Sequence, residues 1–151
     1  MLMAWALPLL LWATCALAGP PWAGQVVGVI DGDTVRVMHD TTQVKVRLAG
    51  IDAPESKQPW GMPAKWYLWR LVFGQTVQVV EQGTDRYGRL IAELWALIST
   101  GPVVVDGVGV RWMRNVNQTL VAEGYAWVYI PYARYDPQLP VLERQARQMR
   151  L

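Results

Sequence analysis

Three carboxylates in the first half of the chain fall at turns or strand ends, where side chains from different segments can converge. Asp33 follows Gly32, while Asp52 and Glu55 share one short turn that contains Pro54. Three carboxylates brought together repel one another unless a cation lies among them. Oxygen ligands without accompanying His or Cys favour a hard cation, Ca²⁺ or Mg²⁺. The alternative is three solvated turn acids, which are common beside Gly and Pro. Because the acids occur together on consecutive strands, we favour the cation site.

Two arginines form a second candidate group. Arg47 lies on the strand that leads to Asp52, and Arg89 follows Gly88 directly after a tight turn. A guanidinium that faces a phosphoryl group stabilises the charge that develops in a transition state. The alternative for either arginine alone is a surface ion pair, which contributes little to stability. Arginine dominates the 14 basic residues, and its planar guanidinium suits bidentate contact with phosphate.

The composition excludes several other kinds of site. Cys15 is the only cysteine and His39 the only histidine. A histidine-based catalytic triad, a histidine-rich metal site and a zinc site built from cysteines are therefore excluded. We expect His39 to be an exposed turn residue. The formal net charge is +2, so binding a polyanion requires basic residues that cluster locally.

Hydrophobic periodicity predicts the elements that position these residues. Apolar and polar residues alternate over 34–38 and 43–49, and the segment 24–30 is rich in β-branched residues. This pattern predicts a three-stranded antiparallel meander. In a flat sheet the alternation places Asp33 and Arg47 on opposite faces. We therefore expect the coiling of a barrel, or a bulge near the preceding glycine, to bring them together.

The rest of the chain combines helices and strands in one domain. We expect a loop over 50–60 and an extra hairpin within 97–113. The other predicted elements are a helix over 62–73, strands over 75–81 and 89–95, a helix over 115–123, a strand over 125–129 and a helix over 141–149. Five short strands with a helix between the third and fourth form the order of an OB barrel. The fold class is therefore mainly β with α, a five-stranded OB barrel with three helices.

The N-terminal segment predicts export from the cytoplasm. Residues 1–18 carry no charged side chain and end in small residues around Ala16 and Ala18. This pattern is typical of a cleaved secretory signal peptide, which would leave a single secreted or periplasmic domain over 19–151. Two alternatives remain open. The segment is just long enough for an uncleaved membrane anchor, and Cys15 makes a poor match to a lipoprotein signal.

At these residues the chain resembles the staphylococcal nuclease family. The resemblance extends from about residue 25 to residue 151 and rests on four blocks, in the family's order and at compatible spacing. The blocks are IDGDTV at 30–35, VRLAGIDAPES at 46–56, TDRYGR at 84–89 and NVNQTLVAEGYA at 115–126. Together they imply the OB barrel with three helices that the element order predicts.

The resemblance implies a metal site that binds Ca²⁺. Asp33 and Asp52 correspond to the family's metal-binding aspartates. Ala53 corresponds to the residue that offers its backbone carbonyl to the metal, although the family usually has Thr there. Asp31 corresponds to an acid that lies outside the direct metal ligands.

The resemblance also implies a set of catalytic and substrate-binding residues. Glu55 corresponds to the proposed general base, and Arg47 and Arg89 to the two catalytic arginines. The residues that correspond to contacts with substrate phosphate or base are Arg86, Tyr87 and Tyr132. Three features depart from the family: Ile130 replaces a substrate-contacting Tyr, 97–113 is longer than usual, and the usual Trp-containing end is missing after Leu151.

These observations favour an enzyme. The expected activity is that of a secreted Ca²⁺-dependent nuclease that hydrolyses DNA and RNA to 3′-phosphate ends, and we expect a monomer without an obligate protein partner. The alternative is a non-catalytic OB module that binds single-stranded nucleic acid. The complete set of acids and arginines favours the enzyme.

Overall fold

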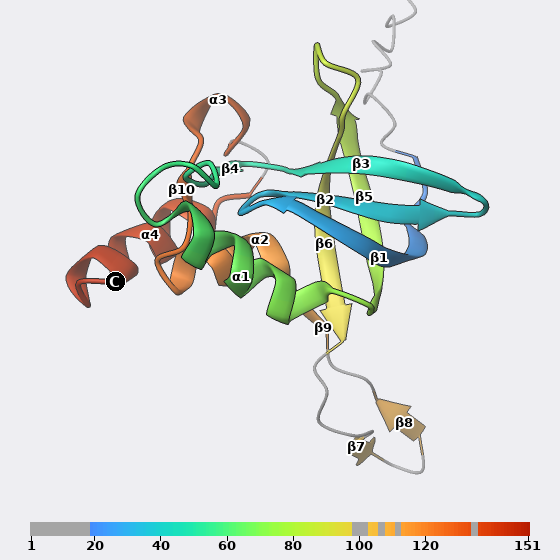
Figure 1. Cartoon of the computed structure of the whole chain (residues 1–151). Coiled ribbons are helices and arrows are strands. Elements are labelled where there is room, and N and C mark those ends of the chain that lie inside the picture. Colours follow the sequence, from blue (N-terminus) through green and yellow to red (C-terminus); the bar gives the residue numbers. More distant parts are fainter. Residues whose placement is uncertain (1–18, 98–102, 106–107, 111–112, 134–135) are drawn as a thin grey trace, which may run out of the picture.

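A five-stranded closed barrel forms the main body of the molecule (Figure 1). The computed structural model describes residues 19–97, 103–105, 108–110, 113–133 and 136–151. The barrel strands are β1 (Trp22–Asp31), β2 (Thr34–His39), β3 (Thr42–Leu48), β5 (Thr76–Thr84) and β6 (Leu90–Leu97). They are hydrogen-bonded in the order β3-β2-β1-β5-β6, and a parallel pairing between β3 and β6 closes the barrel. The predicted OB barrel and antiparallel meander are confirmed.

Alternating side chains of the meander build the barrel core. Val35 on β2 lies directly opposite Val46 on β3, and both are fully buried. Their neighbours Arg36 and Lys45 are exposed and also lie opposite each other. Successive side chains of a strand point to opposite faces, so the apolar positions face inward as the sequence predicts. His39 is exposed, as expected, and ends β2.

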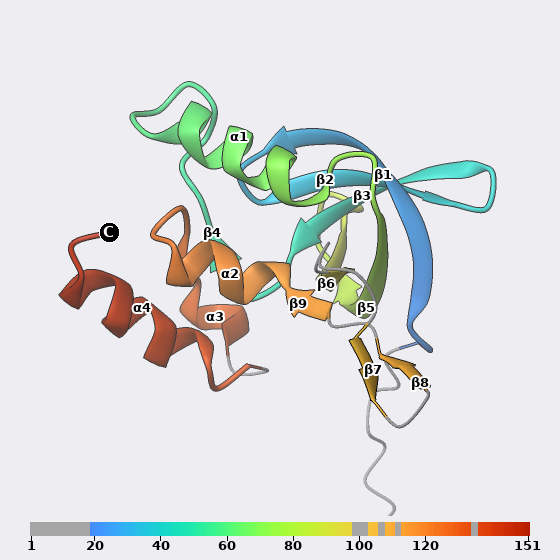
Figure 2. The ribbon, with the colours of Figure 1, turned by 90° about the horizontal axis from the view of Figure 1, so that it is seen from below.

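The helices gather on one side of the barrel (Figure 2). They are α1 (Gly61–Val72), α2 (Val116–Ala122), α3 (Ile130–Ala133) and α4 (Leu139–Gln148). Helix α1 packs against β1, while α2 contacts both α4 and β6. The three predicted helices are present, and the one-turn helix α3 was not predicted. Helix α4 begins two residues earlier than expected because Pro140 lies in its first turn, where no backbone donor is needed.

Several short strands extend this framework. Strand β4 (Ile51–Asp52) pairs with β10 (Trp127–Val128). The prediction of a loop over the whole of 50–60 is therefore wrong for these two residues. A two-residue strand is too short for hydrophobic periodicity to reveal it. Strands β7 (Val103–Val105) and β8 (Val108–Val110) form the expected extra hairpin, and β9 (Met113–Asn115) pairs with β6. Within the part of the chain that the structure describes, no helix is long and apolar enough to cross a membrane.

Candidate active site

Asp33 lies in the turn between β1 and β2. Asp31 pairs with Thr34 across this turn, so Gly32 and Asp33 form its tip. A Cβ at Gly32 would lie 2.8 Å from the Cβ of Ala64 on α1, which is why this position requires glycine. Because Asp33 belongs to the turn, the alternation of β2 does not fix the direction of its side chain. Asp33 and Arg47 are therefore not forced onto opposite faces, and β1 has a register shift between Val29 and Asp31, in agreement with the irregularity expected near Gly32.

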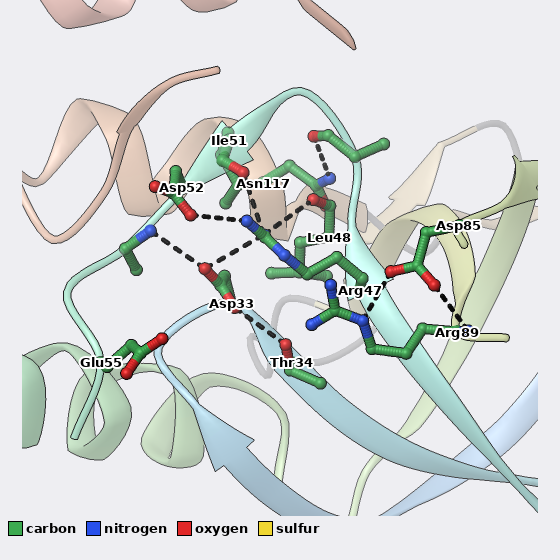
Figure 3. A network of polar contacts seen from close by, with 12 residues as sticks. Asp33, Thr34, Arg47, Leu48, Ile51, Asp52, Glu55, Asp85, Arg89 and Asn117 are labelled. Carbon is green, nitrogen blue, oxygen red and sulfur yellow. Dashed lines mark hydrogen bonds and ion pairs between the residues drawn. The ribbon is translucent and has the colours of Figure 1, made fainter. Parts of the chain in front are cut away.

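Arg47 joins two of the predicted carboxylates (Figure 3). Its Nη1 lies 3.0 Å from Oδ2 of Asp33, and its Nη2 lies 2.6 Å from Oδ1 of Asp52. Nη1 also donates to the carbonyl of Ile51 at 2.9 Å. The residues that share this guanidinium come from the β1–β2 turn, β3 and β4. The structure thus brings Asp33, Arg47 and Asp52 together, as the sequence predicts.

Asp33 is buried, and its carboxylate accepts two hydrogen bonds besides its ion pair with Arg47. The Thr34 hydroxyl donates to its Oδ1 at 2.8 Å, and the backbone N–H of Ala53 donates to its Oδ2 at 3.0 Å. Burial raises the pKa of Asp33, whereas Arg47 and these two donors lower it, and the net pKa lies above the usual value. Ala53 therefore touches the site through its N–H in this structure.

Glu55 lies on a tightly folded loop after β4. Its carboxylate is exposed, and no hydrogen bond or ion pair joins that carboxylate to another described residue. The side chain of Gln58 accepts from the Glu55 N–H, and the Gln58 N–H donates to the Glu55 carbonyl. A Cβ at Gly61 would collide with this carbonyl, so the loop needs glycine there. Asp31 supports the same loop, because it accepts from the hydroxyl and N–H of Ser56.

Arg89 is held by its own turn. Its Nε lies 2.6 Å from Oδ2 of Asp85, and Oδ1 of Asp85 accepts the backbone N–H groups of Tyr87 and Arg89. Burial raises the pKa of Asp85, but hydrogen bonds from Arg89 and Tyr87 outweigh this and place the net pKa below the usual value. Asp85 was not predicted as a site residue. Its sequence signal is an Asp before Gly88 in a tight turn, where such side chains bind nearby N–H groups.

A pocket of about 450 Å³ is lined by five of the ten predicted site residues, whereas Asp33, Ala53 and Glu55 are not among its lining residues. Its lining includes Arg47, Asp52, Arg86, Tyr87, Arg89 and Tyr129. The two arginines come from adjacent segments, because β3 and β6 pair in parallel with Arg47 beside Ile91. The guanidinium of Arg86 lies 4.8 Å from the centre of the Tyr87 ring, and Tyr87 is exposed. Arg86 and Arg89 thus lie beside the exposed ring of Tyr87. Such an arrangement suits a phosphate ester that carries a base.

The predicted substrate contacts near the C-terminus are only partly described. Tyr132 belongs to α3, but its side chain lies outside the described part of the structure. Tyr129, which was not assigned a role, lines the pocket instead. Ile130 is exposed at the start of α3.

Asn117 is a further residue that sequence reasoning missed. It is fully buried at the start of α2. Its Nδ2 donates to the carbonyls of Ala49 and Ala92, and its Oδ1 accepts from the N–H of Leu94. These bonds tie α2 to the strand pair that closes the barrel, directly before the site segment (Figure 3). The sequence feature that could have revealed Asn117 is a polar residue at a position of α2 that faces the core.

The donor chemistry fits a hard cation. Asp52 is more exposed than Asp33, and its Oδ2 has no hydrogen-bond partner among the described residues. The nearby donors are carboxylate and carbonyl oxygens, which Ca²⁺ prefers. The described residues contain no group of three or more His, Cys, Asp or Glu side chains in a metal-binding arrangement. In this structure the Arg47 guanidinium supplies the positive charge between the two aspartates.

Comparisons with known proteins agree on one family. A family model described as staphylococcal nuclease homologue matches residues 45–151. A micrococcal nuclease of Shigella flexneri is 42% identical over 136 residues, which cover 87% of this chain and 75% of the relative. An uncharacterized endonuclease of Escherichia coli O157:H7 is 43% identical over 127 residues, which cover 84% of this chain and 73% of the relative. The range matched by the family model contains Arg47, Asp52, Glu55 and Arg89.

Proposed function

Because the chain belongs to the staphylococcal nuclease homologue family, we propose that it is a Ca²⁺-dependent nuclease that hydrolyses phosphodiester bonds of DNA and RNA. The observation that carries this proposal is the pocket in which Arg47, Asp52 and Arg89 converge. The guanidinium groups bind the phosphate and stabilise the charge that grows on its oxygens during attack. Two guanidinium groups in the lining of one pocket favour a phosphodiester over a neutral substrate.

Glu55 acts as the general base in this proposal. Its carboxylate is exposed and free of described partners, so it can accept a proton from an attacking water. The water oxygen bonds to phosphorus, the bond to the 5′ oxygen breaks, and the leaving oxygen takes a proton from solvent. The products are a 3′-phosphate end and a free 5′-hydroxyl. Asp85 keeps the Arg89 guanidinium in position through their 2.6 Å contact.

Asp33, Asp52 and the Ala53 carbonyl would hold the cation. When bound, Ca²⁺ supplies positive charge that polarises the phosphoryl group. Arg47 would then contact phosphate as well as the aspartates. We also propose that residues 1–18 are removed as a signal peptide and that the mature protein acts in the periplasm or outside the cell, as a monomer.

The experiment is cleavage of single-stranded DNA and RNA by the purified protein, in Ca²⁺ and then in excess chelator. We expect Ca²⁺-dependent cleavage that leaves 3′-phosphate ends. Glu55→Gln should lower the rate by about 10²–10⁴-fold, the usual contribution of a general base, while circular dichroism and Ca²⁺ affinity stay unchanged. A folded protein that binds single-stranded nucleic acid without cleaving it in Ca²⁺ would instead identify a binding module.

A further inference from the structure

A second pocket, of about 830 Å³, lies beside the active site and has no role in the proposed reaction. We call it the aromatic pocket. The lining residues that matter here are Pro54, Pro59, Trp60, Tyr125, Trp127 and Arg150. Its walls come from the loop after β4, the segment around β10 and the end of the chain after α4. Aromatic and proline side chains make most of this surface apolar.

The two pockets meet at one cross-strand pair. Trp127 on β10 lies directly opposite Asp52 on β4. Side chains that are directly opposite on antiparallel strands project to the same face, with Cβ atoms about 4.5–5.5 Å apart. Asp52 lines the active-site pocket and Trp127 lines the aromatic pocket. The aromatic pocket therefore begins about one strand spacing from the candidate catalytic centre.

The loop that carries Glu55 forms another wall of the aromatic pocket. The lining of that pocket includes Gln58, Pro59 and Trp60. Gln58 accepts the Glu55 N–H with its side chain and donates its own N–H to the Glu55 carbonyl. Gly61 packs against the Glu55 carbonyl so closely that no side chain fits. The wall of the aromatic pocket and the proposed general base thus belong to one closely packed loop.

The two tryptophan rings of the pocket are open to solvent, and its tyrosine ring is stacked on a neighbour. Trp60 is 73% exposed and Trp127 is 41% exposed. Trp60 adopts φ +64°, a left-handed backbone conformation that costs a non-glycine residue roughly 1 kcal/mol or more. Tyr125 stacks on the Tyr67 ring at a centroid distance of 4.1 Å, which fixes its plane. Exposed aromatic rings of this kind provide flat apolar faces for a planar ligand.

The pocket contains one cationic side chain that could bind a phosphate. Arg150 lines the pocket, and no ion pair joins it to a carboxylate among the described residues. Glu123 lines the same pocket and would repel a phosphate that came close to it, while its neighbour Gly124 packs against Leu151. Nucleobases are neutral and stack on aromatic side chains regardless of sequence. A single-stranded nucleic acid supplies both a planar base for the aromatic rings and a neighbouring phosphate for Arg150.

We propose that the aromatic pocket binds a nucleobase of the single-stranded nucleic acid whose phosphodiester lies between Arg47 and Arg89. This inference rests on the proposed nuclease function and extends its substrate from one phosphodiester to a strand of several nucleotides. The base stacks on Trp60 and Trp127, and the adjoining strand crosses the Asp52–Trp127 pair.

The test compares a thymidine dinucleotide with an octathymidylate as substrates in Ca²⁺, using the full protein. In Trp60→Ala and Trp127→Ala, kcat/KM should fall about five- to fiftyfold more for the octanucleotide than for the dinucleotide, in keeping with the contribution of one stacked base. Trp60→Phe should restore most of the preference for the longer strand. The matched control is Trp66→Ala on α1, another exposed tryptophan, which should keep the wild-type ratio.

An unchanged length preference in Trp60→Ala, relative to Trp66→Ala, would overturn the aromatic pocket as a base site while leaving the nuclease intact. If Trp127→Ala loses its folded spectrum, the Trp60 variants decide. A wild-type protein that cleaves neither substrate would refute the nuclease instead. Binding of fluorescein-labelled octathymidylate, measured by anisotropy, would then decide the pocket: weaker binding by Trp60→Ala than by Trp66→Ala supports it, and equal binding overturns it.

Discussion

The two arginines of the candidate active site are held in opposite ways. Arg47 is mostly buried and binds Asp33 and Asp52, which come from different parts of the chain. Arg89 is more exposed, and its carboxylate partner Asp85 lies four residues away in the same turn. Arg47 thus joins three elements of the fold, whereas Arg89 depends on one local turn. We therefore predict that Arg47 serves both stability and the proposed catalysis, and that Arg89 serves catalysis with little effect on the rest of the fold.

The largest effect is expected from Arg47→Ala. It removes a phosphate ligand, which should lower the cleavage rate by about 10³-fold. It also leaves Asp33 buried without its cation, and breaking such a pair destabilises a protein by about 3 kcal/mol or more. Urea unfolding and single-turnover cleavage measure the two losses. Arg36→Ala, an exposed arginine on the neighbouring strand, is the matched control and should change neither quantity by much. A fully stable Arg47→Ala protein would contradict the proposed structural role.

Arg89→Ala should reduce activity nearly as much but leave stability almost intact. The loss of one phosphate-binding group costs about 10²–10³-fold in rate. Its ion pair with Asp85 is partly exposed, and such pairs contribute at most about 1 kcal/mol. The same urea and single-turnover measurements apply. Equal destabilisation by Arg47→Ala and Arg89→Ala would remove the distinction between the two arginines.

The sequence predicted those features of the fold and of the site that depend on local patterns. Alternation of Val35 and Val46 with Arg36 placed the meander correctly, because one face of each strand is buried. The order of elements and the four sequence blocks led to the barrel and to the arginines and acids that the structure brings into one region. Asp33 was predicted at a turn or strand end, but the direction of its side chain was not, because strand alternation was extended one residue too far.

Contacts between distant segments account for what the sequence did not predict. Asn117 donates to the carbonyl of Ala49, 68 residues away in the sequence. No local pattern predicts a contact between residues so far apart in the chain. The β4–β10 pairing depends on two residues per strand, and the place of Tyr129 in the pocket depends on that pairing. Asp85 was identifiable as a turn residue, but its bond to Arg89 becomes clear only from the side-chain geometry.

Asp85→Asn tests how far the local turn positions Arg89. Asparagine keeps an oxygen for the N–H groups of the turn but loses the charge that binds the guanidinium, so we expect cleavage about tenfold slower, with KM and kcat determined separately. The folded pKa of Asp85 lies below its ordinary value of 3.8. Its contribution to stability is therefore complete above that value and is lost as the pH falls through the lower, folded pKa.

The pH dependence gives a second readout of Asp85→Asn. Urea unfolding of the wild type and the variant should differ near neutral pH, and the difference should shrink below about pH 4. Arg89→Ala should show part of the same change, because it removes one of the groups that lower the pKa of Asp85. A stability difference that stays constant down to about pH 3 would show that Asp85 is not held by Arg89 in solution.

The smallest effect is expected from Thr34→Val, which isolates one of the contacts to Asp33. Valine keeps the shape and β-branching of Thr34 but removes the hydroxyl that donates to Asp33 Oδ1 at 2.8 Å. Arg47 and the Ala53 N–H still bind the other carboxylate oxygen. We expect a loss of about 1 kcal/mol in the free energy of unfolding and a several-fold loss of activity. A loss as large as that of Arg47→Ala would mean that the hydroxyl, rather than the guanidinium, fixes the Asp33 carboxylate. The β1–β2 turn, and not Arg47, would then stabilise the buried part of the site.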